Sequence, residues 1–240
     1  MIDLYYWPTP NGWKVSIMLE ECGLSYEVHA VHIGRGDQFK PEFLAISPNN
    51  RIPAIVDRDA PGGEMTIFES GAILVYLAEK SGCLLPSDQH ARFDVLQWLF
   101  WQMGGLGPMA GQLGHFRNYA KESIDYAVQR YADEYNRLLG VIDRRLADRE
   151  YLAGDYSIAD VAAWPWVRSS ERLGQPLDDF TNLRRWFDHI AARPAVKRGI
   201  EVGLDWWGEP QLDTESRKNL FGQTASQVGK LAEQAAQNED

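Results

Sequence analysis

Residues 2–23 read IDLYYWPTPNGWKVSIMLEECG and carry the first fold signal in the chain. The run at 2–6 is short and apolar, and Pro8 and Pro10 end it, which is typical of a strand that leads into a loop. From Gly12 onward the apolar residues recur at helical spacing, and Gly23 ends the pattern as a C-cap glycine does. This stretch therefore predicts a strand, a proline-bracketed loop and a helix in direct succession.

The residues up to position 82 continue to alternate between strand and helix signals. Strands are predicted at 26–33, 52–57 and 65–68, the second beginning at a proline, where a missing backbone donor does little harm. Short helical patterns occupy 41–45 and 70–81, and Gly82 closes the second. The order predicts a small α/β layer over residues 1–82. A strand, a proline loop, a helix and a later Ile-Pro strand are how a thioredoxin-like layer begins.

Past Pro86 the strand signals stop and the pattern is helical. Residues 93–103 are apolar at helical spacing, and the glycines and proline at 104–108 are expected to bend or break that helix. Helices are also predicted at 124–146, 183–193 and 195–201, and Ser157-Ile-Ala-Asp160 matches a capping box. We expect a linker at 82–89 and an all-helical domain at 90–203. An acidic, glutamine-containing tail follows at 204–240, with a possible short amphipathic helix through Val228, Leu231, Ala232 and Ala235.

The composition is that of an ordinary soluble protein. The chain has 24 Lys and Arg against 34 Asp and Glu, a net charge of −10, which speaks against a broad nucleic-acid-binding face. The uncharged stretch from Val95 to Phe116 is long enough to span a bilayer, but it contains three glutamines, five glycines and a proline. We therefore expect a buried helix there and no membrane association. The acidic third residue and the lack of a basic leader are unlike a secretory signal.

The number and positions of the cysteines indicate a reducing compartment and the absence of dithiol chemistry in the first loop. Cys22 and Cys83 are too few for a disulfide scaffold, which favours a reducing cytoplasm. A dithiol enzyme of the thioredoxin-like type would carry Cys-x-x-Cys after the first strand, whereas residues 7–11 read WPTPN. The protein therefore uses no dithiol of its own there. His29 and His32 would face opposite sides of a strand, so no metal site is predicted.

A set of short motifs resembles the cytosolic glutathione transferases, and most narrowly the bacterial Nu class, whose members act as glutathione-dependent disulfide-bond reductases. The motifs are Pro8-Thr-Pro-Asn-Gly12, Pro41-Glu-Phe-Leu44, Ile46-Ser-Pro-Asn-Asn50, Ile52-Pro-Ala-Ile-Val56, Phe68-Glu-Ser-Gly-Ala-Ile73, Gln97-Trp-Leu-Phe-Trp-Gln102, Gly104-Gly-Leu-Gly-Pro-Met109 and Tyr156-Ser-Ile-Ala-Asp160. The resemblance implies an α/β thioredoxin-like N-terminal domain that binds glutathione, an all-α C-terminal domain, and a homodimer.

Glutathione is a small anion with two carboxylates, one ammonium and a thiol. Ser70, at a predicted helix N-terminus, can hold a carboxylate through its hydroxyl, free backbone donors and the helix dipole, although a plain N-cap is the alternative. Glu69 beside it can pair with the γ-glutamyl ammonium. The resemblance implies a cis Ile52–Pro53 bond that lets the backbone of Ile52 pair with the cysteinyl unit. An ordinary trans proline at the start of a strand is the alternative.

Thr9 and Asn11 are the candidates beside the glutathione sulfur. Their hydroxyl and amide donors can stabilise a thiolate, but neither is a strong base, so we assign them polarisation of the thiol. Tyr5 and Tyr6 lie on the first strand and must face opposite ways. Core packing is expected for both, with a phenol at the site as the alternative.

Two more contacts are implied by the resemblance. Gln38 would contact glutathione, and Arg130 would bind a glutathione carboxylate, in its own subunit or in the other one. The alternative for Arg130 is a solvated charge on an amphipathic helix.

The second substrate needs an apolar pocket, which we expect beside the predicted helix break at 104–108. The aromatic and sulfur side chains around that break are Trp98, Phe100, Trp101, Met103, Met109 and Phe116. Trp98 and Phe100 are expected in the helical core, as are Trp164 and Trp166. Of the histidines, His115 is the one placed to reach the pocket.

The sequence thus predicts a glutathione-dependent disulfide-bond reductase in which the reactive cysteine belongs to bound glutathione, reduced or oxidised, and small disulfides or electrophiles are the partners. Conventional conjugation of glutathione to electrophiles is one alternative. A catalytically silent glutathione-binding interaction protein is another.

Overall fold

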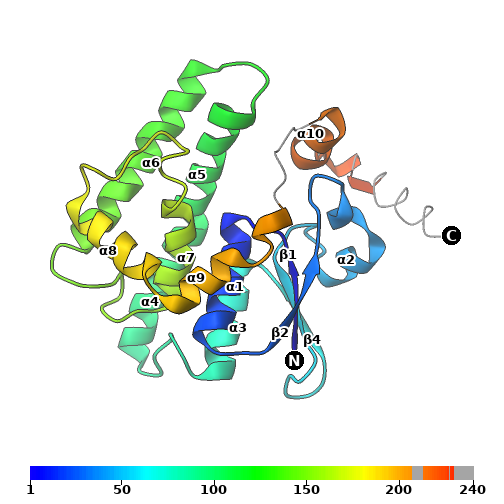
Figure 1. The fold of residues 1–240 in the computed structure, drawn as a ribbon, viewed down its shortest axis with the longest axis horizontal. Coiled ribbons are helices and arrows are strands. Elements are labelled where there is room, and N and C mark those ends of the chain that lie inside the picture. Colours follow the sequence, from blue (N-terminus) through cyan, green and yellow to red (C-terminus); the bar gives the residue numbers. More distant parts are fainter. Residues whose placement is uncertain (207–212, 227, 230–240) are drawn as a thin grey trace.

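The protein, described by a computed structural model over residues 1–206, 213–226 and 228–229, consists of an α/β half followed by a helical half (Figure 1). The α/β half contains β1 (Ile2–Tyr6), α1 (Pro10–Glu21), β2 (Tyr26–Ala30), the 3₁₀ turn η1 (Asp37–Phe39), α2 (Pro41–Ile46), β3 (Ala54–Asp57), β4 (Met65–Phe68) and α3 (Ser70–Ser81). The helical half contains α4 (Gln89–Trp101), the π-helix η2 (Gln102–Leu106), α5 (Gly107–Gly114), the π-helix η3 (His115–Tyr119), α6 (Asp125–Arg145), α7 (Ile158–Val167), α8 (Thr181–Ala191) and α9 (Pro194–Glu201). The 3₁₀ turn η4 (Leu204–Trp206) and α10 (Thr214–Phe221) follow.

The four strands form one mixed sheet in the order β2-β1-β3-β4. β1 and β2 are parallel, whereas β3 is antiparallel to both of its neighbours. The parallel pair is joined through α1, as a parallel connection requires. This is the thioredoxin-like layer that the sequence predicts, and an all-helical domain follows it.

The two faces of the sheet are covered by different helices. Ile2, Leu4 and Tyr6 are buried in the core shared with α1 and α3, which lie between the sheet and the helical half (Figure 1). Tyr5 points the other way, where its ring lies 6.2 Å from that of Phe43 in α2. The alternation of side chains along a strand thus places both tyrosines in packing roles, as predicted.

The turn from β1 into α1 is fixed by local chemistry. Thr9 is the N-cap of α1, and its Oγ1 accepts a hydrogen bond of 3.2 Å from the backbone N–H of Gly12. Pro10 occupies the first turn, where its missing N–H does no harm. A Cβ on Gly12 would lie 2.2 Å from the carbonyl oxygen of Trp7, so this close approach requires glycine.

Two predicted strands are shorter than the sequence pattern indicates. The strand expected at 26–33 ends at Ala30, because the backbone N–H of His32 leaves the ladder and donates to the Asp37 carboxylate at 2.8 Å. The strand expected from Ile52 begins at Ala54. The Ile52–Pro53 bond before it is cis, as the resemblance implies.

Of the bend or break predicted at 104–108, the break is wrong, because the chain stays helical there. The π-helix η2 connects α4 to α5 without interruption, and Pro108 falls in the first turn of α5. Proline has no backbone N–H to donate, and the wider π turn accommodates this missing hydrogen bond without ending the helix. A Cβ on Gly107 would lie 2.7 Å from the side-chain Nε2 of buried Gln102, so glycine lets this side chain pack closely against the turn.

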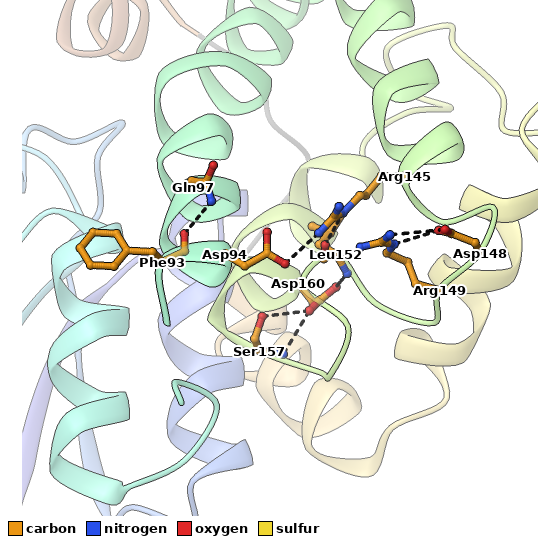
Figure 2. A network of polar contacts seen from close by, with 9 residues as sticks. All are labelled: Phe93, Asp94, Gln97, Arg145, Asp148, Arg149, Leu152, Ser157 and Asp160. Carbon is orange, nitrogen blue, oxygen red and sulfur yellow. Dashed lines mark hydrogen bonds and ion pairs between the residues drawn. The ribbon is translucent and has the colours of Figure 1, made fainter. Parts of the chain in front are cut away.

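The predicted capping box at the start of α7 is confirmed, and it ties three helices together (Figure 2). The backbone N–H and hydroxyl of Ser157 donate to one oxygen of the Asp160 carboxylate, at 3.1 and 3.2 Å. The other oxygen accepts from the backbone N–H of Leu152 at 3.0 Å. Arg145 of α6 donates to the carbonyl of Leu152 at 2.7 Å and pairs with Asp94 of α4 at 2.9 Å (Figure 2).

The aromatic side chains of α4 divide between core and surface. Trp98 packs against the core as predicted, but Phe100 is 67% exposed, so its expected core position is wrong. Phe93, two turns earlier on the same face, is 56% exposed. Helix α4 is therefore apolar on a side that no part of the described chain covers.

The tail contributes a helix that the sequence did not predict. Helix α10 lies against the α/β half near α2 (Figure 1), where the Asn219 amide donates to the carbonyl of Gly34 at 3.0 Å. Leu231, Ala232 and Ala235 of the expected tail helix lie outside the described residues. Within the described residues no helix combines the length and the apolar character needed to cross a bilayer.

Candidate active site

Two cavities open beside the N-terminus of α1, at the junction of the two halves. The smaller, of about 240 Å³, is lined by Asn11 of α1, by Ser47, Arg51, Ile52 and Pro53 before β3, by Phe68, Glu69 and Ser70 at the start of α3, and by Met103 of η2. The larger, of about 550 Å³, is lined by Thr9 and by residues of α5, α7 and α10. Thr9 lines the larger cavity and Asn11 lines the smaller one, so the turn at residues 9–11 borders both cavities.

The start of α3 presents open backbone donors to the smaller cavity. Ser70 is the first helical residue and not the N-cap, so the plain N-cap alternative is wrong. The N-cap is Glu69, whose side chain makes no capping hydrogen bond and whose φ of 71° lies in the left-handed region. Such a conformation costs a non-glycine residue about 1–3 kcal/mol and is typical of binding sites. The uncapped helix N-terminus suits an anion.

Glu69 supplies the opposite charge at the rim of the same cavity. It is exposed, and its carboxylate accepts a hydrogen bond of 3.3 Å from the side chain of Asn49. An anion-binding helix terminus beside a carboxylate can hold both charges of an α-amino acid group.

Behind this cavity lies a lysine that sequence reasoning does not identify as a site residue. Lys14 of α1 is 1% exposed, and its ammonium donates to the Gln102 amide oxygen at 2.7 Å and to the Ser70 hydroxyl at 3.3 Å. The signal available was a lysine between apolar neighbours on the buried side of the predicted helix. This signal is weak, because most helix lysines lie on the solvated face.

The donors around the candidate sulfur position are oriented by their neighbours. Because the Thr9 oxygen accepts from Gly12, the hydroxyl proton of Thr9 remains free to donate. The Asn11 amide oxygen accepts a hydrogen bond of 3.1 Å from the indole N–H of Trp166, which leaves the amide N–H groups for other partners. Trp166 was expected to be a core residue, but it is only partly buried and lines the larger cavity.

The larger cavity is mostly apolar and differs from the predicted one. Trp13, Trp166 and Phe221 contribute rings, and Arg168 and Arg172 bring positive charge to it. Met103 lines the smaller cavity instead, and Trp98, Phe100, Trp101, Met109 and Phe116 line neither. The expectation fails because the helix at 104–108 does not break. His115 reaches the cavity only through its contact with Phe221, at 4.8 Å between ring centroids.

Two expected glutathione contacts lie away from these cavities. Gln38 is buried behind α10, and its amide N–H groups donate to the carbonyls of Ile33 and Asn219 at 3.0 and 3.4 Å. Arg130 is exposed on α6, near Glu134. The structure therefore brings together Thr9, Asn11, Ile52, Glu69 and Ser70, and leaves Gln38 and Arg130 outside.

Neither cysteine is close to this site. Cys22 caps the far end of α1 and contacts Met18 and Ser81, and burial raises the pKa of its thiol. Cys83 lies exposed after α3.

A group of possible metal ligands, formed by Asp3, Glu27 and His29, lies elsewhere on the sheet. The Asp3 carboxylate is paired with Arg58, so its charge is already balanced.

Comparison with known proteins gives a consistent result. Residues 1–79 match the glutathione S-transferase N-terminal domain, and residues 108–194 match the C-terminal domain. The disulfide-bond oxidoreductase YfcG of Escherichia coli is 51% identical over 203 residues, which cover 83% of this chain and 94% of the relative.

Solved structures agree with this result. A glutathione transferase family member from Pseudomonas fluorescens with two glutathione bound has a TM-score of 0.79 at 50% identity, covering 83% of this chain and 92% of that one. A glutathione transferase from Pseudomonas putida, with one glutathione disulfide bound per subunit, has a TM-score of 0.80 at 48% identity, covering 84% and 91%.

Proposed function

The chain belongs to the glutathione S-transferase family, and from this premise we propose that it is a glutathione-dependent disulfide-bond reductase of the bacterial Nu class. The observation that carries the proposal is the pair of cavities that border one cysteine-free turn, which offers the Thr9 hydroxyl and the Asn11 amide as donors. Reduction of a disulfide by glutathione consumes two glutathione molecules, so an enzyme of this kind needs adjacent places for two sulfur-bearing groups.

The smaller cavity is the proposed place for the first glutathione. Its γ-glutamyl carboxylate would lie on Ser70 and the N-terminus of α3, and its ammonium would lie against Glu69. The backbone of Ile52 would pair with the cysteinyl unit in the manner of an added strand. This arrangement brings the sulfur to Thr9 and Asn11.

The proposed chemistry is thiol–disulfide exchange between bound molecules. The glutathione thiolate attacks one sulfur of a disulfide R–S–S–R, which forms a mixed disulfide and releases one R–S⁻. A second glutathione thiolate attacks the glutathione sulfur of the mixed disulfide, forming glutathione disulfide and releasing the second R–S⁻. Both electrons come from the two glutathione molecules, and the released thiolates take up the two protons that the glutathione thiols gave to solvent.

The protein contributes electrostatics and positioning to this exchange. The Thr9 hydroxyl, the Asn11 amide and the N-terminus of α1 favour the thiolate over the thiol. The proposed exchange uses no protein thiol, and the positions of Cys22 and Cys83 away from both cavities support this.

We also propose a cytoplasmic homodimer. Phe93 and Phe100 leave one side of α4 apolar and exposed, which suits a second copy of the chain. A role for Arg130 at the ligand would then depend on the second copy, since Arg130 lines neither cavity of its own chain.

The experiment is a comparison of two activities. Turnover of hydroxyethyl disulfide is followed with glutathione, glutathione reductase and NADPH, and conjugation is followed with a chloro-nitroarene. The proposal expects disulfide turnover well above background and weak conjugation. The apolar lining of the larger cavity favours conjugation as the second candidate, and the reverse pattern would select it. Retention on immobilised glutathione with neither activity would instead indicate the catalytically silent glutathione-binding interaction protein.

A further inference from the structure

Lys14 combines deep burial with the absence of a carboxylate partner. Its ammonium contacts the Gln102 amide oxygen, the Ser70 hydroxyl and the Met103 sulfur, at 2.7, 3.3 and 3.3 Å. All three groups are neutral, and no carboxylate of the described residues forms an ion pair with it. A buried ammonium is expected to have a paired anion, because removing the charge from water costs several kcal/mol.

The environment of Lys14 contains little negative charge. Burial lowers the pKa of its ammonium to about 7, and the charge of Glu69 only partly opposes this. Helix α3 and η2 present neutral groups to it. Near the other end of α1, Glu20 and Glu21 are paired with Arg198 and Arg193. Among the described residues, Glu69 at the cavity rim therefore compensates the charge of Lys14 only in part.

An anion that would balance the charge of Lys14 can bind in the smaller cavity, on the other side of Ser70. Ser70 and Met103, both in contact with Lys14, line the smaller cavity. Because the Ser70 oxygen accepts from the ammonium, the hydroxyl proton points elsewhere, and its present acceptor is the weak Met103 sulfur at 3.7 Å. A carboxylate in the cavity would be a far better acceptor for that proton.

We propose that Lys14 is a positioning residue that orients the Ser70 hydroxyl and supplies the positive charge for a carboxylate bound at the N-terminus of α3. The proposal rests on the proposed function, in which that carboxylate is the α-carboxylate of the γ-glutamyl residue of glutathione. Together with Arg51, which lines the same cavity, Lys14 gives a chain with a net charge of −10 local positive charge for an anionic ligand. This role also explains why a lysine occupies a position where methionine would pack without the loss of hydration.

The proposal has a thermodynamic consequence. A bound carboxylate favours the charged form of Lys14, so the pKa of Lys14 rises when the ligand binds. The group is partly deprotonated in the empty protein at pH 8 and protonated in the complex, so binding takes up a proton. Affinity should fall as pH rises above about 7, the pKa of Lys14 in the empty site.

The test measures binding by calorimetry at pH 8 in phosphate and in Tris, whose different ionisation enthalpies report proton uptake. The probe is S-methylglutathione, which has no titrating thiol. The parent should take up between about 0.5 and 0.9 proton per ligand, and Lys14→Met should take up none and bind about 10- to 100-fold more weakly. Lys197→Met, at an exposed lysine of α9, is the matched control and should behave as the parent.

A second ligand separates this role from a structural one. The analogue carries a carboxamide in place of the γ-glutamyl α-carboxylate. Loss of the carboxylate should weaken binding to the parent at least about tenfold and binding to Lys14→Met less than about threefold. Thermal melting should show that the variant still unfolds cooperatively, with a modest loss of stability because the buried Gln102 amide oxygen loses its donor.

The role of Lys14 would be overturned if the carboxamide analogue weakened binding equally in the parent and in Lys14→Met. It would also be overturned if the parent took up no proton on binding. Either result would leave the proposed function standing. Absence of S-methylglutathione binding to the parent would overturn both. If ligand binding is accompanied by the proton uptake that depends on Lys14 but disulfide turnover is absent, the role of Lys14 is supported and only the reductase activity is rejected.

Discussion

Asn11 offers a graded test of how the site stabilises the glutathione thiolate. Its amide oxygen is held by Trp166 at 3.1 Å, so its N–H groups are the ones available to the sulfur. A hydrogen bond to a charged group contributes about 1.5–3 kcal/mol, and 1.36 kcal/mol corresponds to a tenfold change in an acid dissociation constant. Asn11→Ala should therefore raise the pKa of the bound glutathione thiol by about 1 to 2.

Asn11→Asp makes the test sharper because it preserves the shape and the acceptor for Trp166. The variant replaces the donor with a negative charge about 5 Å or less from the sulfur, and the repulsion at an effective dielectric constant of 20 is about 3 kcal/mol. The thiol pKa should then exceed that in Asn11→Ala by about 2. We therefore predict that the pKa of the bound glutathione thiol rises from the parent to Asn11→Ala and again to Asn11→Asp.

The assay is the pH profile of kcat/KM for hydroxyethyl disulfide, together with ultraviolet titration of the bound thiolate. The exposed Asn136→Ala is the matched control and should leave both unchanged. The assignment of Asn11 as a donor to the thiolate would be refuted if the thiol pKa were unchanged in Asn11→Ala. It would also be refuted if the thiol pKa in Asn11→Asp were no higher than in Asn11→Ala.

Three further changes test other parts of the structure. Asp160→Asn should lower the free energy of unfolding by about 2–6 kcal/mol in urea titration, because two buried donors lose their acceptor, whereas exposed Asp155→Asn should change it little. Phe221→Ala, which removes a ring from the larger cavity, should raise KM for the disulfide about fivefold and leave kcat nearly unchanged; an unchanged KM would exclude α10 from the site. Phe100→Glu should shift the mass seen by light scattering from that of two chains to 27.2 kDa, and a dimer that persists would exclude the exposed face of α4 as its interface.

Much of the α/β half follows from local signals. Thr9, Pro10 and Gly12 mark the start of α1 by capping, by a fixed φ and by a close backbone approach, and each of these is a property of the residue type. The capping box at Ser157 and Asp160 is equally local. Such features can be predicted because neighbours in the chain determine them.

The features that sequence reasoning missed depend on partners far along the chain. Gln102 and Gly107 sustain a π turn where glycine and proline suggested a break, because the packing around them favours a continuous helix. Lys14 resembles a solvated charge until α3 and η2 are seen to enclose it. Trp166 resembles a core residue until its N–H is seen to reach Asn11.

Helix α10 belongs to the same group. Its sequence is polar, and the contacts of Asn219 with Gly34 and of Phe221 with His115 hold it in place. The residue pattern within α10 does not predict these contacts, because the partners lie far away in the sequence.

The central claim is that bound glutathione, and no cysteine of the chain, carries the exchange. The most direct measurement is the steady-state rate of the Cys22→Ser, Cys83→Ser double variant with hydroxyethyl disulfide and glutathione. Because both thiols lie away from the two cavities, kcat/KM should stay within about twofold of the parent value. A loss of more than about tenfold in a variant that melts at the parent temperature would contradict the claim and place a protein thiol in the reaction.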